Sequence, residues 1–224
     1  MLERSNRLDG EGWLALLGGG EFSFGETEEA DAAWLAKTPE GPIAFLPVAS
    51  GSADYATHFS TYVSEVLERE ALTVPIYRAR DTRRGKNLAR IAESAAVYLG
   101  GGVAETLVGA LAESPALEAL ETRVSTGGVV VAMAAAAQAL AARYRSLTGR
   151  EALTGLAWLP RTAVETNFDP AHDRRIRELL EAPGMTWGLG LPSGSAILFG
   201  PDGTIETAGA VMILEEPEGD WKLL

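Results

Sequence analysis

The sequence predicts an α/β domain with three layers, in which helices cover both faces of a largely parallel, doubly wound sheet. Short apolar runs of strand length alternate with helix-like segments through the first two thirds of the chain, as in parallel sheets. Glycine-rich turns follow two of these runs, at residues 18–20 and 100–102. The β-branched run 128–133 continues into four alanines without a loop. Such a run indicates a strand buried on both faces, and alanine is the best helix former.

Hydrophobic periodicity and capping residues define the elements expected in the first part of the chain. The expected strands are residues 13–17, 43–48, 72–77, 95–99 and 128–133. The expected helices are residues 27–37, 55–70, 87–93, 103–111, 115–122 and a last one from the alanines to about Tyr144. Ser52 stands where the N-cap of the second helix belongs, and Ser114 with Pro115 opens the fifth.

The last third of the chain has shorter elements and more turns. Residues 156–159 and 162–166 are short strand candidates, and a helix should run from the turn at 167–170 to Glu181. Residues 194–199 and 204–214, joined by the turn Pro201-Asp202-Gly203, predict a hairpin at the edge of the sheet.

Composition excludes several classes of function. The formal net charge is −12, which argues against a nucleic-acid backbone or an anionic membrane as a partner. There is no cysteine, so disulfides, thiolate metal sites and cysteine nucleophiles are excluded. The two histidines, His58 and His172, lie far apart without clustered carboxylates, so we expect neither a metal site nor a cofactor.

Residues 1–12 form a polar N-terminal tail, and residues 13–224 form a single domain, because no linker or shift in composition divides them. The tail lacks the apolar segment of a signal peptide. No apolar run reaches the ~20 residues that a membrane span requires. We therefore expect a cytoplasmic protein.

The junction after residues 128–133 is the most informative stretch. A sharp strand-to-helix turn usually presents a nucleophile, because it lifts one side chain clear of the sheet beside a helix N-terminus. The residue at the apex of this turn is Ala134, which carries only a methyl group.

Four segments have the order and spacing of motifs in a known family. Residues 101–107, GGVAETL, align with the pattern G-G-(D/N)-Q-x-x-L and keep its glycines and leucine but neither polar residue. Residues 128–137, GVVVAMAAAA, align with G-V-x-x-G-x-S-A-G-A, with alanine at the serine and at both turn glycines. Residues 165–168, ETNF, align with D-x-H-F before an arginine-rich helix, with asparagine at the histidine. Residues 188–196, GLGLPSGSA, align with G-x-G-x-(D/E)-E-x-T-A but lack its acids. On these residues, nearly the whole chain resembles the cyanophycinase and dipeptidase E (peptidase E) family of serine peptidases. The resemblance implies the flavodoxin-like fold of class I glutamine amidotransferases.

The departures from these motifs fall on the residues that carry the chemistry of the family. Ala134 stands at the position of the serine nucleophile and Asn167 at that of the histidine. Acyl transfer by this mechanism needs both a nucleophile and a base. The resemblance therefore implies a catalytically degenerate relative, with a pocket above Ala134 that is more apolar than in an active enzyme. Its expected lining is Gly101, Gly102, Val103, Met133, Ala134, Ala135, Asn167 and Ser193.

Three functions remain open at this stage. The first is a pseudo-peptidase that binds a small peptide-like or other ligand, or a protein partner. The second is an active hydrolase with a relocated nucleophile. A histidine-based mechanism would have to use His58 or His172, and the hydroxyls considered for it are Ser125, Thr126, Ser193 and Ser195. The third is a structural role, for instance in a homo-oligomer. Arg174, Arg175 and Arg177 could bind an acidic substrate side chain or pair with Asp173 and Glu178.

Overall fold

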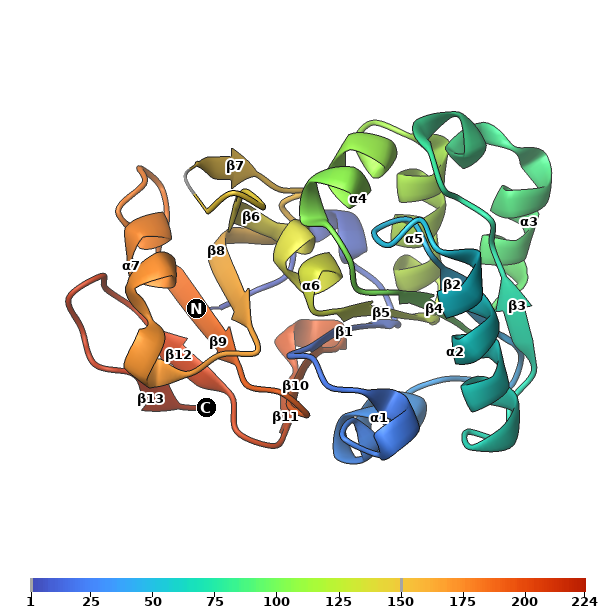
Figure 1. Ribbon diagram of the computed structural model, residues 1–224, viewed down its shortest axis with the longest axis horizontal. Coiled ribbons are helices and arrows are strands. Elements are labelled where there is room, and N and C mark those ends of the chain that lie inside the picture. Colours follow the sequence, from blue (N-terminus) through green and yellow to red (C-terminus); the bar gives the residue numbers. More distant parts are fainter. Residues whose placement is uncertain (1, 150) are drawn as a thin grey trace.

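A seven-stranded sheet forms the centre of the larger part of the molecule (Figure 1). The structure is a computed structural model that describes residues 2–149 and 151–224. In spatial order the strands are β11 (Ile205–Ala208), β10 (Ala196–Phe199), β1 (Trp13–Leu17), β5 (Val129–Met133), β4 (Ala96–Leu99), β2 (Ile43–Leu46) and β3 (Ala71–Thr73). The five strands β1, β5, β4, β2 and β3 pair in parallel. β10 and β11 add an antiparallel hairpin at the β1 edge. The predicted α/β class and edge hairpin are confirmed.

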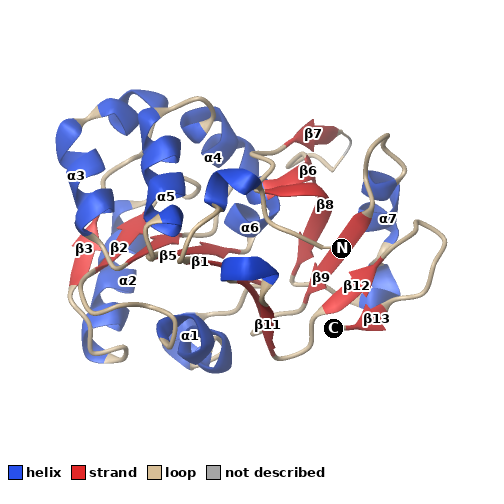
Figure 2. Cartoon of the chain, turned by 180° about the vertical axis from the view of Figure 1, so that it is seen from behind, coloured by secondary structure: helices blue, strands red, loops and turns tan. Residues whose placement is uncertain are grey.

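Helices cover both faces of this sheet, as Figure 2 shows from behind. One face carries α1 (Glu28–Leu35) and α2 (Ala53–Glu65), which pack on a core that includes Phe45, Tyr98 and Val131. Four helices cover the other face. They are α3 (Gly85–Glu93), α4 (Ala104–Leu111), α5 (Pro115–Ser125) and α6 (Ala135–Leu140). Alternate residues of β5 point to opposite cores, so the strand is buried throughout, as its β-branched run predicts.

A second sheet of six strands lies beside the first and was not predicted (Figure 1). In spatial order its strands are β13 (Lys222–Leu223), β12 (Met212–Leu214), β9 (Trp187–Leu191), β8 (Leu159–Thr166), β6 (Ala141–Arg145) and β7 (Ala152–Thr154). The helix α7 (Arg174–Leu180) packs on it through Ile176, Leu179 and Leu180.

The predicted helix from the alanines to Tyr144 is wrong beyond Leu140. The chain turns at Ala141, whose backbone is extended, and continues directly as β6. β6 pairs with β8 on one side and β7 on the other, so tertiary pairing overrides the local helix preference of residues 141–145.

Other boundaries differ from the prediction for local reasons. The strand expected at 72–77 ends at Thr73, shortly before Pro75, which has no amide hydrogen for a ladder. The helix expected at 55–70 begins at Ala53, because the Ser52 hydroxyl accepts the Tyr55 amide at 3.1 Å, and it ends at Glu65. The two short strand candidates near residue 160 are one strand, β8.

The remaining segments of the last third also differ in detail. The second arm of the predicted hairpin, residues 204–214, splits at Gly209, which has a positive φ of 67°, so that β11 joins the first sheet and β12 the second. The predicted helix after residue 167 is a short 3-10 turn, Pro170–His172, followed by α7.

The N-terminal segment is polar in composition but packs on the domain. Leu2 and Leu8 are buried in the core, and Arg4 donates a hydrogen bond of 2.7 Å to the carbonyl of Gly12. Among the helices of the described residues, none has the length and apolar character that crossing a membrane would require.

Candidate functional site

The β5–α6 junction holds Ala134 in a strained conformation. Its φ is 51° and its ψ is −115°, a combination that non-glycine residues rarely adopt and that costs about 1–3 kcal/mol. Two backbone hydrogen bonds fix the turn: the Ala134 amide donates to the Leu17 carbonyl at 3.0 Å, and its carbonyl accepts the Gln138 amide at 3.1 Å. The structure therefore has the sharp turn that the sequence predicts, with a methyl group at its apex.

Asn167 lies on the other side of the end of β1. Its amide donates to the carbonyl of Gly18 at 2.7 Å, and its φ of 49° is also positive. Its side chain fills the space beside Gly19, where a Cβ would lie 2.3 Å from Oδ1 of Asn167. Because Ala134 and Asn167 bond to consecutive residues of one strand end, their α-carbons are separated by roughly two strand spacings, about 10 Å.

The glycine turn after β4 completes this edge of the sheet. A Cβ on Gly101 would lie 3.7 Å from Cβ of Ala134, so the turn passes directly beside the apex. Gly102 has a φ of 150°, and a Cβ there would lie 2.4 Å from the Ala49 carbonyl oxygen, so only glycine fits. The Val103 amide then donates to that same carbonyl at 3.0 Å, which leads the chain into α4.

A cavity of about 170 Å³ lies beside α6 at this edge. It is lined by Gly102, Val103, Ala104, Glu105, Ala135, Gln138, Arg145, Ser146, Leu147, Glu165 and Arg175. The lining has two carboxylates and two guanidinium groups, so this cavity is polar.

Three of the residues expected around Ala134 line this cavity: Gly102, Val103 and Ala135. The others lie elsewhere. Met133 is buried in the core, and Gly101, Ala134 and Asn167 form the neighbouring edge. Ser193 lines a different cavity, near α1, because the loop after β9 folds back and the Gly194 amide donates to Gly19 at 2.9 Å.

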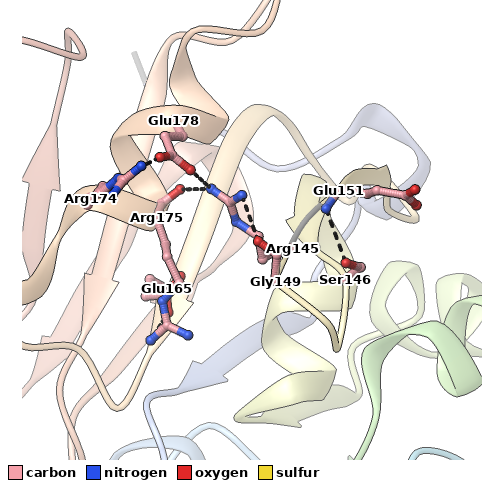
Figure 3. Close-up of polar contacts among 8 residues, drawn as sticks. All are labelled: Arg145, Ser146, Gly149, Glu151, Glu165, Arg174, Arg175 and Glu178. Atoms are coloured by element: carbon pink, nitrogen blue, oxygen red, sulfur yellow. Dashed lines mark hydrogen bonds and ion pairs between the residues drawn. The ribbon is translucent and has the colours of Figure 1, made fainter.

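A network of charged groups joins β6 to α7 on one side of the cavity (Figure 3). Arg145 donates to Glu178 at 2.6 Å and to the carbonyls of Arg175 at 2.9 Å and Gly149 at 3.2 Å. Arg174 donates to the other oxygen of Glu178 at 2.8 Å. Hydrogen bonds from Arg174 and Arg145 lower the pKa of Glu178. The sequence analysis did not predict a role for Arg145, because the residue followed the expected helix end. No local pattern indicates that its side chain lines a cavity.

Glu165 is a largely buried carboxylate of this cavity. Its side chain is 13% exposed and lies 3.4 Å from the Arg175 guanidinium (Figure 3). Burial raises the pKa of Glu165, and the nearby charges of Arg175 and Arg145 lower it by less. The two arginines therefore offset only part of the cost of burying the negative charge of Glu165.

Replacing Glu165 by glutamine should change how stability depends on pH. Because its pKa is raised in the folded state, the native protein holds this proton more tightly than the unfolded chain. Wild-type stability should therefore fall relative to Glu165→Gln as pH rises from the ordinary value of 4.5 through the raised native value. Urea unfolding from pH 4 to 8 measures this. Glu118→Gln, at an exposed position of α5, is the control. If the free energy of unfolding of wild type and of Glu165→Gln changed with pH in parallel, the prediction would be contradicted.

The family comparison agrees with this architecture. The sequence pattern of "Peptidase family S51" matches residues 14–206, which is most of the chain. The chain belongs to peptidase family S51. The resemblance to peptidase E and cyanophycinase is thereby confirmed at the level of the family.

Solved structures show the same fold as this S51 chain. A peptidase from an acI-B1 Actinobacterium superposes with a TM-score of 0.74 at 19% identity, covering 96% of this chain and 94% of the other. A protein described as peptidase E from Listeria monocytogenes EGD-e superposes with a TM-score of 0.63 at 12% identity, covering 88% and 98% respectively. No curated protein matches the chain. The fold is therefore the peptidase E-like, class I glutamine amidotransferase-like α/β fold.

The two histidines of this S51 chain lie outside the edge described above. His172 is 81% exposed, and its Nδ1 lies 2.9 Å from Oδ2 of Asp169. His58 is exposed on α2, with its ring 5.1 Å from that of Phe22. Among the described residues, no hydroxyl hydrogen-bonds to either ring.

Three of the four hydroxyls considered for a relocated nucleophile have local partners, and the fourth, Ser193, lines the cavity near α1. Ser125 and Thr126 donate to the Thr122 carbonyl, at 3.0 and 2.8 Å, and Ser195 donates to the Pro192 carbonyl at 2.7 Å. These are bonds of helix ends and turns, where hydroxyls are common without a chemical role.

The arginines of α7 pair with neighbouring acids. Arg177 donates to Asp173 at 2.6 Å, Arg174 to Glu178, and Arg175 lies beside Glu165. Within residues 2–149 and 151–224, no three or more metal-ligating side chains gather into a group that could hold an ion.

Proposed function

We propose that this chain is a non-catalytic member of family S51 that binds a small peptide-like ligand at the carboxyl edge of the seven-stranded sheet. One observation carries the proposal: the strained turn between β5 and α6 is kept, with φ 51° and ψ −115°, while its apex residue is Ala134. The shape of a nucleophile turn is present and the reactive atom is absent.

The loss of chemistry follows from the two residues at this edge. A methyl group cannot attack a carbonyl carbon, and the amide of Asn167 has no lone pair basic enough to take a proton near neutral pH. Removing the nucleophile or the base of such a unit costs about 10⁶ in turnover, and removing both costs little more. The backbone donors alone leave a rate enhancement of about 10³-fold over the uncatalysed reaction. Peptide hydrolysis by the family mechanism is therefore not expected.

The cavity beside Ala135 supports the binding role. Its walls combine Glu105 and Glu165 with Arg145 and Arg175, beside the methyl groups of Ala104 and Ala135. Groups of both signs are complementary to the ammonium and carboxylate of a short peptide. Retaining this cavity next to an inert apex is consistent with binding without turnover.

The absence of a nucleophile is tested by covalent labelling. We expect that a fluorophosphonate probe adds no mass to the folded protein, because the described serines have no histidine partner. Intact-mass spectrometry after incubation measures this, and an active serine hydrolase under the same conditions shows that the probe is competent. An adduct on any serine of the folded chain would overturn the proposal and support a relocated nucleophile.

The binding role is tested by thermal unfolding with dipeptides that contain aspartate. A ligand present at 100 times its dissociation constant stabilises the native state by about 2.7 kcal/mol. Ala135→Trp, which fills the cavity, should abolish the shift, while Ala89→Trp on an exposed position of α3 should leave it unchanged. Equal shifts in both variants would show that the dipeptides bind elsewhere.

A further inference from the structure

A second cavity, of about 490 Å³, lies between α1 and α2 on the opposite face of the seven-stranded sheet from α6. Its walls include Phe22, Asp31, Leu35, Tyr62 and Val66. It shares no lining residue with the cavity beside Ala135. Its role is therefore separate from the proposed function of that edge.

A buried carboxylate forms part of this cavity. Asp31 is 2% exposed and accepts three hydrogen bonds from neutral donors: Thr27 Oγ1 at 2.6 Å, Trp34 Nε1 at 2.7 Å and Tyr62 OH at 2.7 Å. Burial raises the pKa of Asp31, although these hydrogen bonds act in the opposite direction. No described residue forms an ion pair with it, so its charge is hydrogen-bonded but not neutralised.

The hydrogen bonds leave room for one more donor on Asp31. A carboxylate has about four lone-pair sites. Thr27 and Tyr62 both bond to Oδ2, and Trp34 alone bonds to Oδ1. Oδ1 therefore keeps a lone-pair site to which no described residue donates a hydrogen bond from its side chain.

The walls around this carboxylate are apolar and the remaining charges are negative. Phe22, Tyr62 and Leu35 supply aromatic and aliphatic surface, and Val66 is 62% exposed at the wall. Glu28 and Glu68 are exposed on the same lining, and none of the described lining residues is Lys, Arg or His. Such a lining favours a cation that also has an apolar body. A hard metal ion, in contrast, would require a shell of several oxygen ligands.

We propose that this cavity binds a small organic cation, with its protonated amine on Asp31 and its apolar body against Phe22 and Tyr62. Cations are also attracted to the faces of aromatic rings, which adds to the charge-assisted hydrogen bond. Glu28 and Glu68 attract the cation to the cavity from solvent.

The proposal is tested by calorimetric titration with phenethylamine, using 2-phenylethanol and phenylacetate as the neutral and anionic analogues. The amine should bind at least about tenfold more tightly than the alcohol, as expected for a charge-assisted hydrogen bond, and phenylacetate should not bind. Equal affinity for the amine and the alcohol, or tighter binding of phenylacetate, would overturn the proposal.

Two variants locate the site. Asp31→Asn should weaken amine binding at least about tenfold while removing the preference over the alcohol. Because Asp31 also joins α1 to α2, Val66→Trp provides a second variant, which fills the cavity from its exposed wall without touching the hydrogen bonds of Asp31. It should abolish binding, and Leu223→Trp, at an exposed position of β13, should not. Unchanged amine binding in a folded Asp31→Asn or Val66→Trp protein would show that the site is wrong.

Discussion

Ala134→Ser combined with Asn167→His is expected to give a protein that fluorophosphonates label at residue 134. The backbone of the turn already has the conformation that presents the apex side chain, and serine is no more strained there than alanine. The helix α6 begins at the next residue, so its first amides have no partner within the helix and can stabilise a developing oxyanion. The backbone of Asn167 bonds to the same strand end as that of Ala134, which separates the two α-carbons by roughly two strand spacings, about 10 Å.

The two substitutions should act together rather than additively. A serine without a base is a weak nucleophile, and a positioned general base contributes about 10²–10⁴-fold. Ala134→Ser alone should therefore be labelled about 10²–10⁴-fold more slowly than the double variant. Quenching the labelling reaction at set times, followed by intact-mass spectrometry, gives the labelling rates of the single and the double variant.

A matched control separates the position from the residue type. Ala89→Ser with Asn167→His introduces the same two side chains, but the serine lies at an exposed position of α3. It should not be labelled. Equal rates for the single and double variants would show that residue 167 does not serve residue 134, and no labelling of either would show that the edge has lost more than these two groups.

Trp34→Ala should be the most destabilising single substitution on the α1 side of the sheet. Trp34 is fully buried, its ring packs 6.1 Å from that of Tyr98, and its Nε1 donates to Asp31 at 2.7 Å. Removing a buried tryptophan side chain costs about 3–5 kcal/mol. The loss also deprives a buried carboxylate of a donor, which adds about 1–3 kcal/mol.

Chemical denaturation measures this effect, and Trp221→Ala is the matched control. Trp221 also donates to a carboxylate at 2.7 Å, that of Asp173, but it is only half-buried near the end of the chain. Its replacement should cost less than half as much. If the two variants were equally stable, burial of Trp34 and its bond to Asp31 would not contribute as argued.

Much of the first sheet could be predicted from the sequence because its signals are local. The β-branched run of β5 and the alanines after it predict a buried strand and a sharp turn, and Ser52 and Ser114 predict the helix starts. Ala134 and Asn167 were found by comparing motifs, and the structure places them on either side of one strand end.

The second sheet and the wall of the candidate cavity could not be predicted in this way. Residues 141–145 follow a helix and have no strand-specific pattern, and they become β6 only because β8 and β7 supply partners for their backbone. Arg145 then reaches Glu178 on α7, a contact between residues far apart in the chain.

The sequence by itself thus determined the order of the main strands and helices, the turn at Ala134 and the absence of a cysteine or serine there. Those features depend on residue type and on neighbours a few positions away. Only the tertiary structure decided that β6 is a strand, that Ser193 lies away from the cavity and that Asp31 is buried beside Tyr62. Each of these depends on which distant segments pack together, and that is set by the burial of whole faces rather than by any local pattern.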